Sequence, residues 1–139
     1  MHSENRLEHV AIAVDDLDAA IALFSSILGM PDSGRELVES EQVQVAFFDL
    51  DGARIELLEP TTDDSPVGRF LQRRGAGLHH IALEVPNIDQ ALERCRAAGL
   101  RTVGEAPRRG AGGRRVAFLH PGSTGGVLLE LSEPPRPQE

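Results

Sequence analysis

The most constraining feature of this sequence is that its second half repeats the pattern of its first. Leu-Glu-His-Val-Ala-Ile-Ala-Val at 7–14 matches Leu-His-His-Ile-Ala-Leu-Glu-Val at 78–85, with a histidine in the same place. Later, Ile-Glu-Leu-Leu-Glu-Pro at 55–60 is echoed by Leu-Glu-Leu-Ser-Glu-Pro at 129–134. Because neither half of the 139-residue chain is large enough to bury a sheet alone, we expect the halves to pack together.

Each half is expected to contain a helix after its opening strand. Apolar residues recur at helical spacing over 15–28, where aspartates precede the periodic stretch and Gly29 follows it. The same pattern covers 88–98 and ends at Gly99. The chain therefore changes from strand to helix at matching places in its two halves.

Further strands complete both halves. The segments 43–50 and 53–59 read as strands joined through Asp51-Gly52, a pair that favours a hairpin turn. In the second half, the expected strands are 101–104, 114–119 and 126–132.

These elements predict an α+β fold made of one domain, residues 1–139. The domain contains two βαββ-type repeats, at about 6–60 and 78–134. A helical connector is expected at about 65–75, because serine followed by proline is a favourable helix start.

The alternation of each opening strand assigns a face to its histidine, since successive side chains point to opposite faces. The apolar residues of 7–14 share one face, so His9 lies on the other, beside alanines. His80 is placed in the same way in the second half. Both histidines are therefore expected away from the face that packs on a helix.

The last strand of each half adds a glutamate to the same face. Glu56 lies between apolar neighbours that point the other way, and Glu130 does so in the second half. The separation between histidine and glutamate is nearly equal in the two halves. His9, Glu56, His80 and Glu130 are thus related by the repeat.

Two imidazoles and two carboxylates suit one divalent metal ion, such as Zn²⁺, Ni²⁺, Co²⁺ or Mn²⁺. The alternative is that the glutamates meet water on an outer sheet face and that the histidines are only remnants of the repeat. The small neighbours of the histidines favour the metal, because a solvated face usually carries larger polar side chains.

Composition excludes several classes of function. The formal net charge is −8 and all 14 basic residues are arginines, more of them in the second half of the chain. Without lysine, Schiff-base catalysis and a lysine-tipped phosphate loop are excluded. A binder of duplex nucleic acid would normally be basic, so no nucleic-acid partner is expected.

The expected compartment is the cytoplasm. Cys95 is the only cysteine and cannot form an internal disulfide. No apolar stretch approaches the length of a membrane helix, and the first residues do not resemble a signal peptide. No membrane association is predicted.

The most specific motifs follow the second helix. They are Gly-Ala-Gly-Gly-Arg-Arg-Val-Ala-Phe-Leu-His-Pro at 110–121 and Gly-Gly-Val-Leu-Leu-Glu-Leu at 125–131. With the segments around His9 and His80, they resemble the vicinal oxygen chelate superfamily (glyoxalase, bleomycin resistance and dioxygenase proteins), and within it the methylmalonyl-CoA epimerases.

This resemblance implies paired βαβββ modules that form a cupped mixed sheet around a metal, with helices on the outer face. It implies inversion of C2 of methylmalonyl-CoA by 1,1-proton transfer through an enolate that the metal stabilises. The expected cofactor is one divalent ion (Co, Mn, Ni or Zn), and the expected assembly is a homodimer.

The resemblance also assigns residues. His9, Glu56, His80 and Glu130 match the metal ligands, and Glu130 matches a position that also acts as acid and base. Some family members carry a second, glutamate base on a neighbouring strand, where this chain has Val45. We therefore hypothesise that Glu56 takes that role, with Glu41 as the next candidate.

The acyl-CoA substrate requires groups that bind anions. The arginines that flank the glycine loop 110–113 are candidates for its phosphates, and His120 is a candidate for a carboxylate. The four arginines are Arg108, Arg109, Arg114 and Arg115.

Two other functions remain open. A glyoxalase I-type lactoylglutathione lyase can use the same ligands, although it typically shows Asp-Pro-Asp-Gly where this chain has His120-Pro121-Gly122. A metal-free binding protein of the same superfamily would lack the complete ligand set.

Overall fold

The computed structural model describes residues 5–137, apart from the side chain at position 105. The chain divides into two compact units. The first unit is His9–His79, and the second contains the chain from His80 onward together with the segment before His9.

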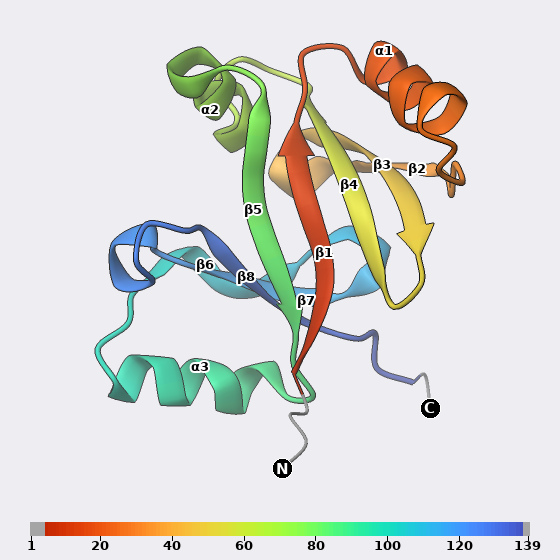
Figure 1. The fold of residues 1–139 in the computed structure, drawn as a ribbon. Helices are drawn as coiled ribbons and strands as arrows, with labels where there is room; N and C mark the ends of the chain where they lie inside the picture. Colours follow the sequence, from red (N-terminus) through yellow and green to blue (C-terminus); the bar gives the residue numbers. More distant parts are fainter. Residues whose placement is uncertain (1–4, 138–139) are drawn as a thin grey trace. The chain divides into compact units, whose positions relative to one another are not determined.

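The elements of the first repeat and the connector helix lie in the first unit, except that β1 begins before His9 (Figure 1). They are β1 (Arg6–Ala13), α1 (Leu17–Ala22), a π-helical turn (Leu23–Ile27), β2 (Arg35–Val38), a 3-10 turn (Glu39–Glu41), β3 (Val43–Leu50), β4 (Ala53–Pro60) and α2 (Pro66–Arg74).

The second repeat has the same order of one strand, one helix and three further strands. Its elements are β5 (Gly77–Glu84), α3 (Ile88–Ala97), β6 (Thr102–Arg109), a 3-10 turn (Ala111–Gly113), β7 (Arg115–Leu119), a second 3-10 turn (Pro121–Ser123) and β8 (Leu129–Glu133).

The strands of the two units pair in the same way. The order in the first unit is β2-β3-β4-β1, where β1 pairs with β4 in parallel and the other neighbours are antiparallel. The order in the second unit is β6-β7-β8-β5, where β5 and β8 are the parallel pair. The predicted α+β class and the two βαβββ repeats with mixed pairing are confirmed.

The first helix differs from its predicted extent. The pattern over 15–28 predicts one continuous helix, whereas α1 is followed by the π-helical turn. Asp16 is the N-cap, and its side chain accepts a hydrogen bond from the Ala19 N–H. Gly29, with φ of 75°, follows the turn, as expected of a residue that leaves a helix.

The strand predictions hold best where turn residues mark the ends. β3 and β4 lie where expected, on either side of Asp51-Gly52. β2 was not predicted, because four residues on a sheet edge give too short an alternation to recognise. β6 is longer than the predicted 101–104, because it continues through a register shift between Val103 and Arg108.

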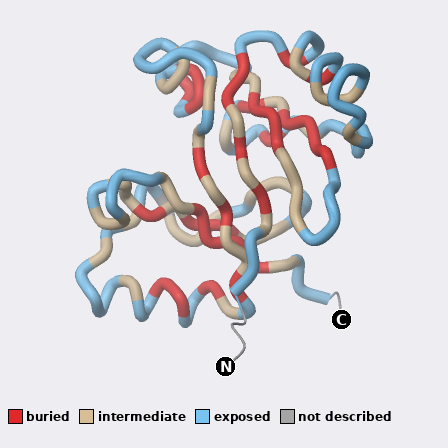
Figure 2. Tube along the Cα trace, viewed as in Figure 1, coloured by how far each residue is buried: buried red, intermediate tan, exposed pale blue. Residues whose placement is uncertain are grey.

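The helix-facing side of each group of strands forms an apolar core. In the first unit, Ile21 packs with Phe48 and Leu57, and in the second Leu92 packs with Leu131. The opposite side is also buried in places, at His9, Glu56, His80 and Glu130. Figure 2 shows that buried residues alternate with less buried ones along the strands. No helix among residues 5–137 has the length and apolar character needed to cross a membrane.

Candidate metal-binding site

In the first unit, the parallel pairing of β1 and β4 brings His9 beside Glu56. Glu56 stands opposite Ala11 in the register, two positions along from His9, so the side chains of His9 and Glu56 are on the same face of the sheet. His9 Nδ1 lies 3.1 Å from Glu56 Oε2. Both residues are only 3% exposed, on the face away from α1.

The second unit repeats this arrangement between β5 and β8. Glu130 stands opposite Ala82, and His80 Nε2 lies 3.1 Å from Glu130 Oε1. His80 is 5% exposed and Glu130 is 6% exposed. Each half of the sequence thus produces one buried histidine–glutamate pair at matching positions.

Burial of the glutamates overturns the alternative in which they meet water. A buried carboxylate is costly unless a positive charge, hydrogen bonds or a metal compensates it. Imidazole nitrogens and carboxylate oxygens are also the donors that borderline divalent ions accept. The chemistry of His9, Glu56, His80 and Glu130 therefore fits a divalent metal.

An aromatic ring lies beside the glutamate of each pair. Phe47 stands opposite Glu56 in the register, and Phe118 stands opposite Glu130. The Phe118 ring meets the His80 ring edge to face, with centroids 5.1 Å apart and planes at 89°. These rings limit where the neighbouring polar groups can move.

An arginine guanidinium also lies over the ring of each phenylalanine. The Arg54 guanidinium carbon lies 4.7 Å from the Phe47 ring centroid, and that of Arg108 lies 5.4 Å from the Phe118 centroid. Arg54 Nη2 is 3.0 Å from Glu56 Oε2. Arg54 is not among the residues predicted from the sequence, although its position two residues before Glu56 places it on the same strand face.

Arg114, one of the four candidate phosphate-binding arginines, is largely enclosed. Its side chain is 15% exposed, and Nη2 lies 2.6 Å from Glu84 Oε1. Its Nε donates a 2.7 Å hydrogen bond to the Ser132 hydroxyl. Glu84 and Ser132 are register partners on β5 and β8, so Arg114 joins these two strands.

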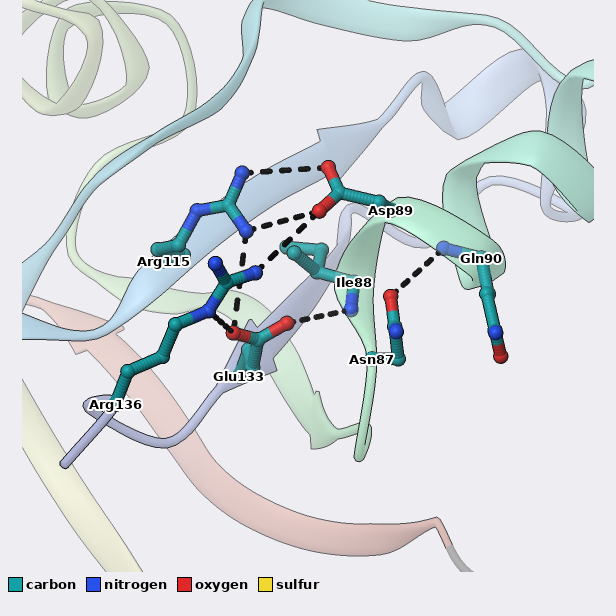
Figure 3. A network of polar contacts seen from close by, with 7 residues as sticks. All are labelled: Asn87, Ile88, Asp89, Gln90, Arg115, Glu133 and Arg136. Atoms are coloured by element: carbon teal, nitrogen blue, oxygen red, sulfur yellow. Dashed lines mark hydrogen bonds and ion pairs between the residues drawn. The ribbon is translucent and has the colours of Figure 1, made fainter.

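Arg115 is held by α3 (Figure 3). Its two terminal nitrogens donate hydrogen bonds of 3.0 and 3.2 Å to Asp89, in the first turn of the helix. The hydrogen bond from Arg115 lowers the pKa of Asp89, and the same bond raises the pKa of Arg115. Arg109, in contrast, is exposed at the end of β6.

The remaining histidines form local contacts. His120 Nδ1 accepts a 3.0 Å hydrogen bond from the Gly122 N–H, which leaves Nε2 as the nitrogen that carries the proton in the neutral ring. His79 meets Phe70 edge to face, with centroids 4.8 Å apart. His120 is therefore a candidate donor through Nε2.

The chain matches one family model and several curated proteins. Residues 8–118 match the model of the Glyoxalase/Bleomycin resistance protein/Dioxygenase superfamily. Human mitochondrial methylmalonyl-CoA epimerase is 43% identical over 129 residues, which cover 92% of this chain and 73% of that protein. The ethylmalonyl-CoA/methylmalonyl-CoA epimerase of Cereibacter sphaeroides is 42% identical over 130 residues, which cover 92% of this chain and 97% of that protein.

A solved structure shows the same fold. It is a variant of Streptomyces coelicolor methylmalonyl-CoA epimerase in complex with 2-nitronate-propionyl-CoA. Its TM-score is 0.90 at 37% identity, and the match covers 95% of this chain and 99% of that chain. The likeness therefore extends over both repeats.

Proposed function

Because the chain belongs to the Glyoxalase/Bleomycin resistance protein/Dioxygenase superfamily and to its methylmalonyl-CoA epimerases, we propose that it inverts C2 of methylmalonyl-CoA by metal-dependent 1,1-proton transfer. The observation that carries this proposal is the pair of buried histidine–glutamate contacts, His9 with Glu56 and His80 with Glu130, in a chain that resembles epimerases over 92% of its length.

His9, Glu56, His80 and Glu130 would together hold one divalent ion, Co, Mn, Ni or Zn. When bound, such an ion supplies Lewis-acid stabilisation of negative charge that develops on the thioester oxygen. Each pair alone offers two donors, fewer than a divalent ion usually takes from a protein.

The two glutamates would also move the proton. In one direction, the Glu130 carboxylate would remove the C2 proton, and Glu56, protonated beforehand, would give its proton to the opposite face of the same carbon and be left as the carboxylate. In the other direction the two exchange roles, so the C–H bond that breaks on one face is replaced by one on the other. Their equivalent places in the repeat suit a reaction whose substrate and product are mirror-related at C2.

The anionic groups of the acyl-CoA require cationic partners. Arg109 is exposed at the end of β6, where its guanidinium would bind a phosphate. Arg108 would contribute from beside Phe118, and His120 Nε2 would donate to a carboxylate. Arg114 and Arg115 already bind carboxylates of this chain, so we assign them the smaller share of phosphate binding.

Hydrogen–deuterium exchange at C2 of methylmalonyl-CoA in heavy water tests this function. Metal-loaded protein should catalyse the exchange, and a chelator should abolish it until metal is restored. Absence of exchange by metal-loaded protein would rule out the epimerase. Turnover of the glutathione hemithioacetal of methylglyoxal, measured in parallel, distinguishes a lactoylglutathione lyase, and metal analysis of the purified protein distinguishes a metal-free binding protein.

We also keep a homodimer and a cytoplasmic location as proposals. The single cysteine, Cys95, is compatible with a reducing compartment. Sedimentation velocity at several protein concentrations determines the assembly, and a single sedimenting species of the monomer mass would contradict the dimer.

A further inference from the structure

The two repeats differ beside their glutamates. Arg54 Nη2 approaches Glu56 Oε2 at 3.0 Å, and His9 Nδ1 approaches the same oxygen at 3.1 Å. In the second repeat, the position equivalent to Arg54 is Leu128, because 55–60 corresponds to 129–134. The symmetry that relates Glu56 to Glu130 therefore does not extend to the residue two places before each.

Arg54 is held in place on both of its sides. It is the register partner of His9 across β1 and β4, and its side chain shares a strand face with that of Glu56. Phe47, the register partner of Glu56 on β3, supports the guanidinium at 4.7 Å from the ring centroid. Stacking on a ring restricts the long arginine side chain, so less rotamer freedom is lost when it binds the carboxylate.

The ion pair between Arg54 and Glu56 is largely buried, which increases its effect on the Glu56 carboxylate. The Arg54 side chain is 25% exposed and the Glu56 side chain is 5% exposed. Exposed ion pairs contribute little, whereas a buried carboxylate depends on the groups that surround it. Groups that hydrogen-bond to a metal ligand fix the orientation of that ligand, and their removal commonly weakens metal binding.

We propose that Arg54 is a positioning residue that fixes the Glu56 carboxylate for metal binding and proton transfer. The inference rests on the proposed function, since it assumes that Glu56 binds the metal. Arg54 and His9 both contact Oε2 of Glu56. The orientation of the Glu56 carboxylate is therefore fixed before a metal or substrate binds.

The test compares three variants with the wild-type protein. Arg54→Met removes the donors but keeps a long stem against Phe47, and Arg54→Lys keeps a positive charge without the planar fork. Arg35→Met is the matched control, because Arg35 in the same unit pairs with Asp18 at 2.7 Å where the side chains are 48% and 81% exposed.

Three quantities are measured on each protein: the dissociation constant of Co²⁺ by competition with a chelator, the visible absorption spectrum of the Co²⁺ form, and kcat and KM for C2 exchange. Arg54→Met should raise the dissociation constant about 10- to 100-fold and change the spectrum. Arg54→Lys should recover part of the affinity, and Arg35→Met should match the wild type.

The outcomes separate this inference from the proposed function. If Arg54→Met folds, binds Co²⁺ with wild-type affinity and gives the wild-type spectrum, Arg54 does not position Glu56, while the epimerase stands. If Arg54→Met does not fold, an Arg54→Lys protein indistinguishable from wild type in affinity and spectrum also overturns the inference. If the wild type neither binds Co²⁺ nor exchanges the C2 proton, the proposed function itself fails.

Discussion

The carboxylate of Glu133 accepts a 2.8 Å hydrogen bond from the backbone N–H of Ile88, the first residue of α3 (Figure 3). Glu59 forms the same contact with the Leu17 N–H at the start of α1, also at 2.8 Å. Glu59 and Glu133 are each the second glutamate of the repeated Glu-x-x-Glu-Pro segment. The last strand of each unit thereby satisfies a backbone donor that its helix leaves unpaired.

Replacing Glu133 by glutamine should lower the free energy of unfolding by about 1–2 kcal/mol. The amide can still accept from Ile88, but the negative charge at the helix start and the pairing with Arg136 Nε, 3.0 Å away, are lost. Urea unfolding measures the change. Glu93→Gln, which removes the same charge from an exposed position of α3, should change it by less than about 0.5 kcal/mol.

The same carboxylate predicts a loss of stability in acid. Burial raises the pKa of Glu133, but the Ile88 N–H and Arg136 together outweigh it, so the pKa lies below the ordinary value of 4.5. A lowered folded-state pKa gives stability that is fully present above pH 4.5 and is lost as the pH falls through the folded-state value. Urea unfolding between pH 7 and 3 should show a smaller acid loss in Glu133→Gln than in wild type; equal slopes would contradict this.

Glutamine at the two candidate proton-transfer positions should reduce kcat for C2 exchange. We expect Glu130→Gln and Glu56→Gln each to lower it by about 10²- to 10⁴-fold, because a neutral amide cannot remove a proton. Exchange followed by mass spectrometry measures the rate. A near wild-type rate for Glu56→Gln would exclude it as the second base and direct attention to Glu41.

Alanine at position 68 should destabilise the first unit. A β-carbon on Gly68 would lie 2.7 Å from the carbonyl oxygen of Asp63 and still closer to that of Thr62, and backbone cannot yield as a side chain can. Overpacking of this kind costs about 1–3 kcal/mol. Thermal and urea unfolding test it, with Gln72→Ala on the exposed side of α2 as the control that should stay near wild type.

The arginines should separate by their exposure, since Arg109 is exposed and the side chain of Arg115 is 34% exposed. Arg109→Met is expected to raise KM for methylmalonyl-CoA about 10-fold with little change in unfolding, since loss of one charge-assisted contact to a phosphate costs about 1.5 kcal/mol. Arg115→Met should act mainly on stability, because it breaks the contacts with Asp89. The reverse assignment of the two effects would place the phosphates at Arg115.

Patterns within the sequence predict most of the fold. The matching octapeptides around His9 and His80 identify the repeat, and glycines mark where the helices end, because these signals depend on neighbouring residues alone. β2 was missed because four residues give too short an alternation, and the extension of β6 was missed because its pairing with β7 passes through a register shift. The π-helical turn after α1 has no counterpart in the apolar spacing of 15–28.

The candidate site was also predicted only in part. Strand alternation places each histidine and glutamate on one face, and the structure brings them into contact within each half. The partners of the arginines were not predicted. Whether Arg114 meets a phosphate or Glu84 depends on which strands lie beside it, and β5 is distant in sequence.

A gene that encoded one half would already have specified a metal-ligand pair and the glutamate that starts its own helix. After duplication of such a gene, the sequences of the two copies can diverge at any position where the two halves no longer need the same residue. Arg54 and Leu128 mark one such divergence. Laboratory evolution of this chain should therefore tolerate asymmetric changes around the ligands far better than changes that remove a glutamate shared by both copies.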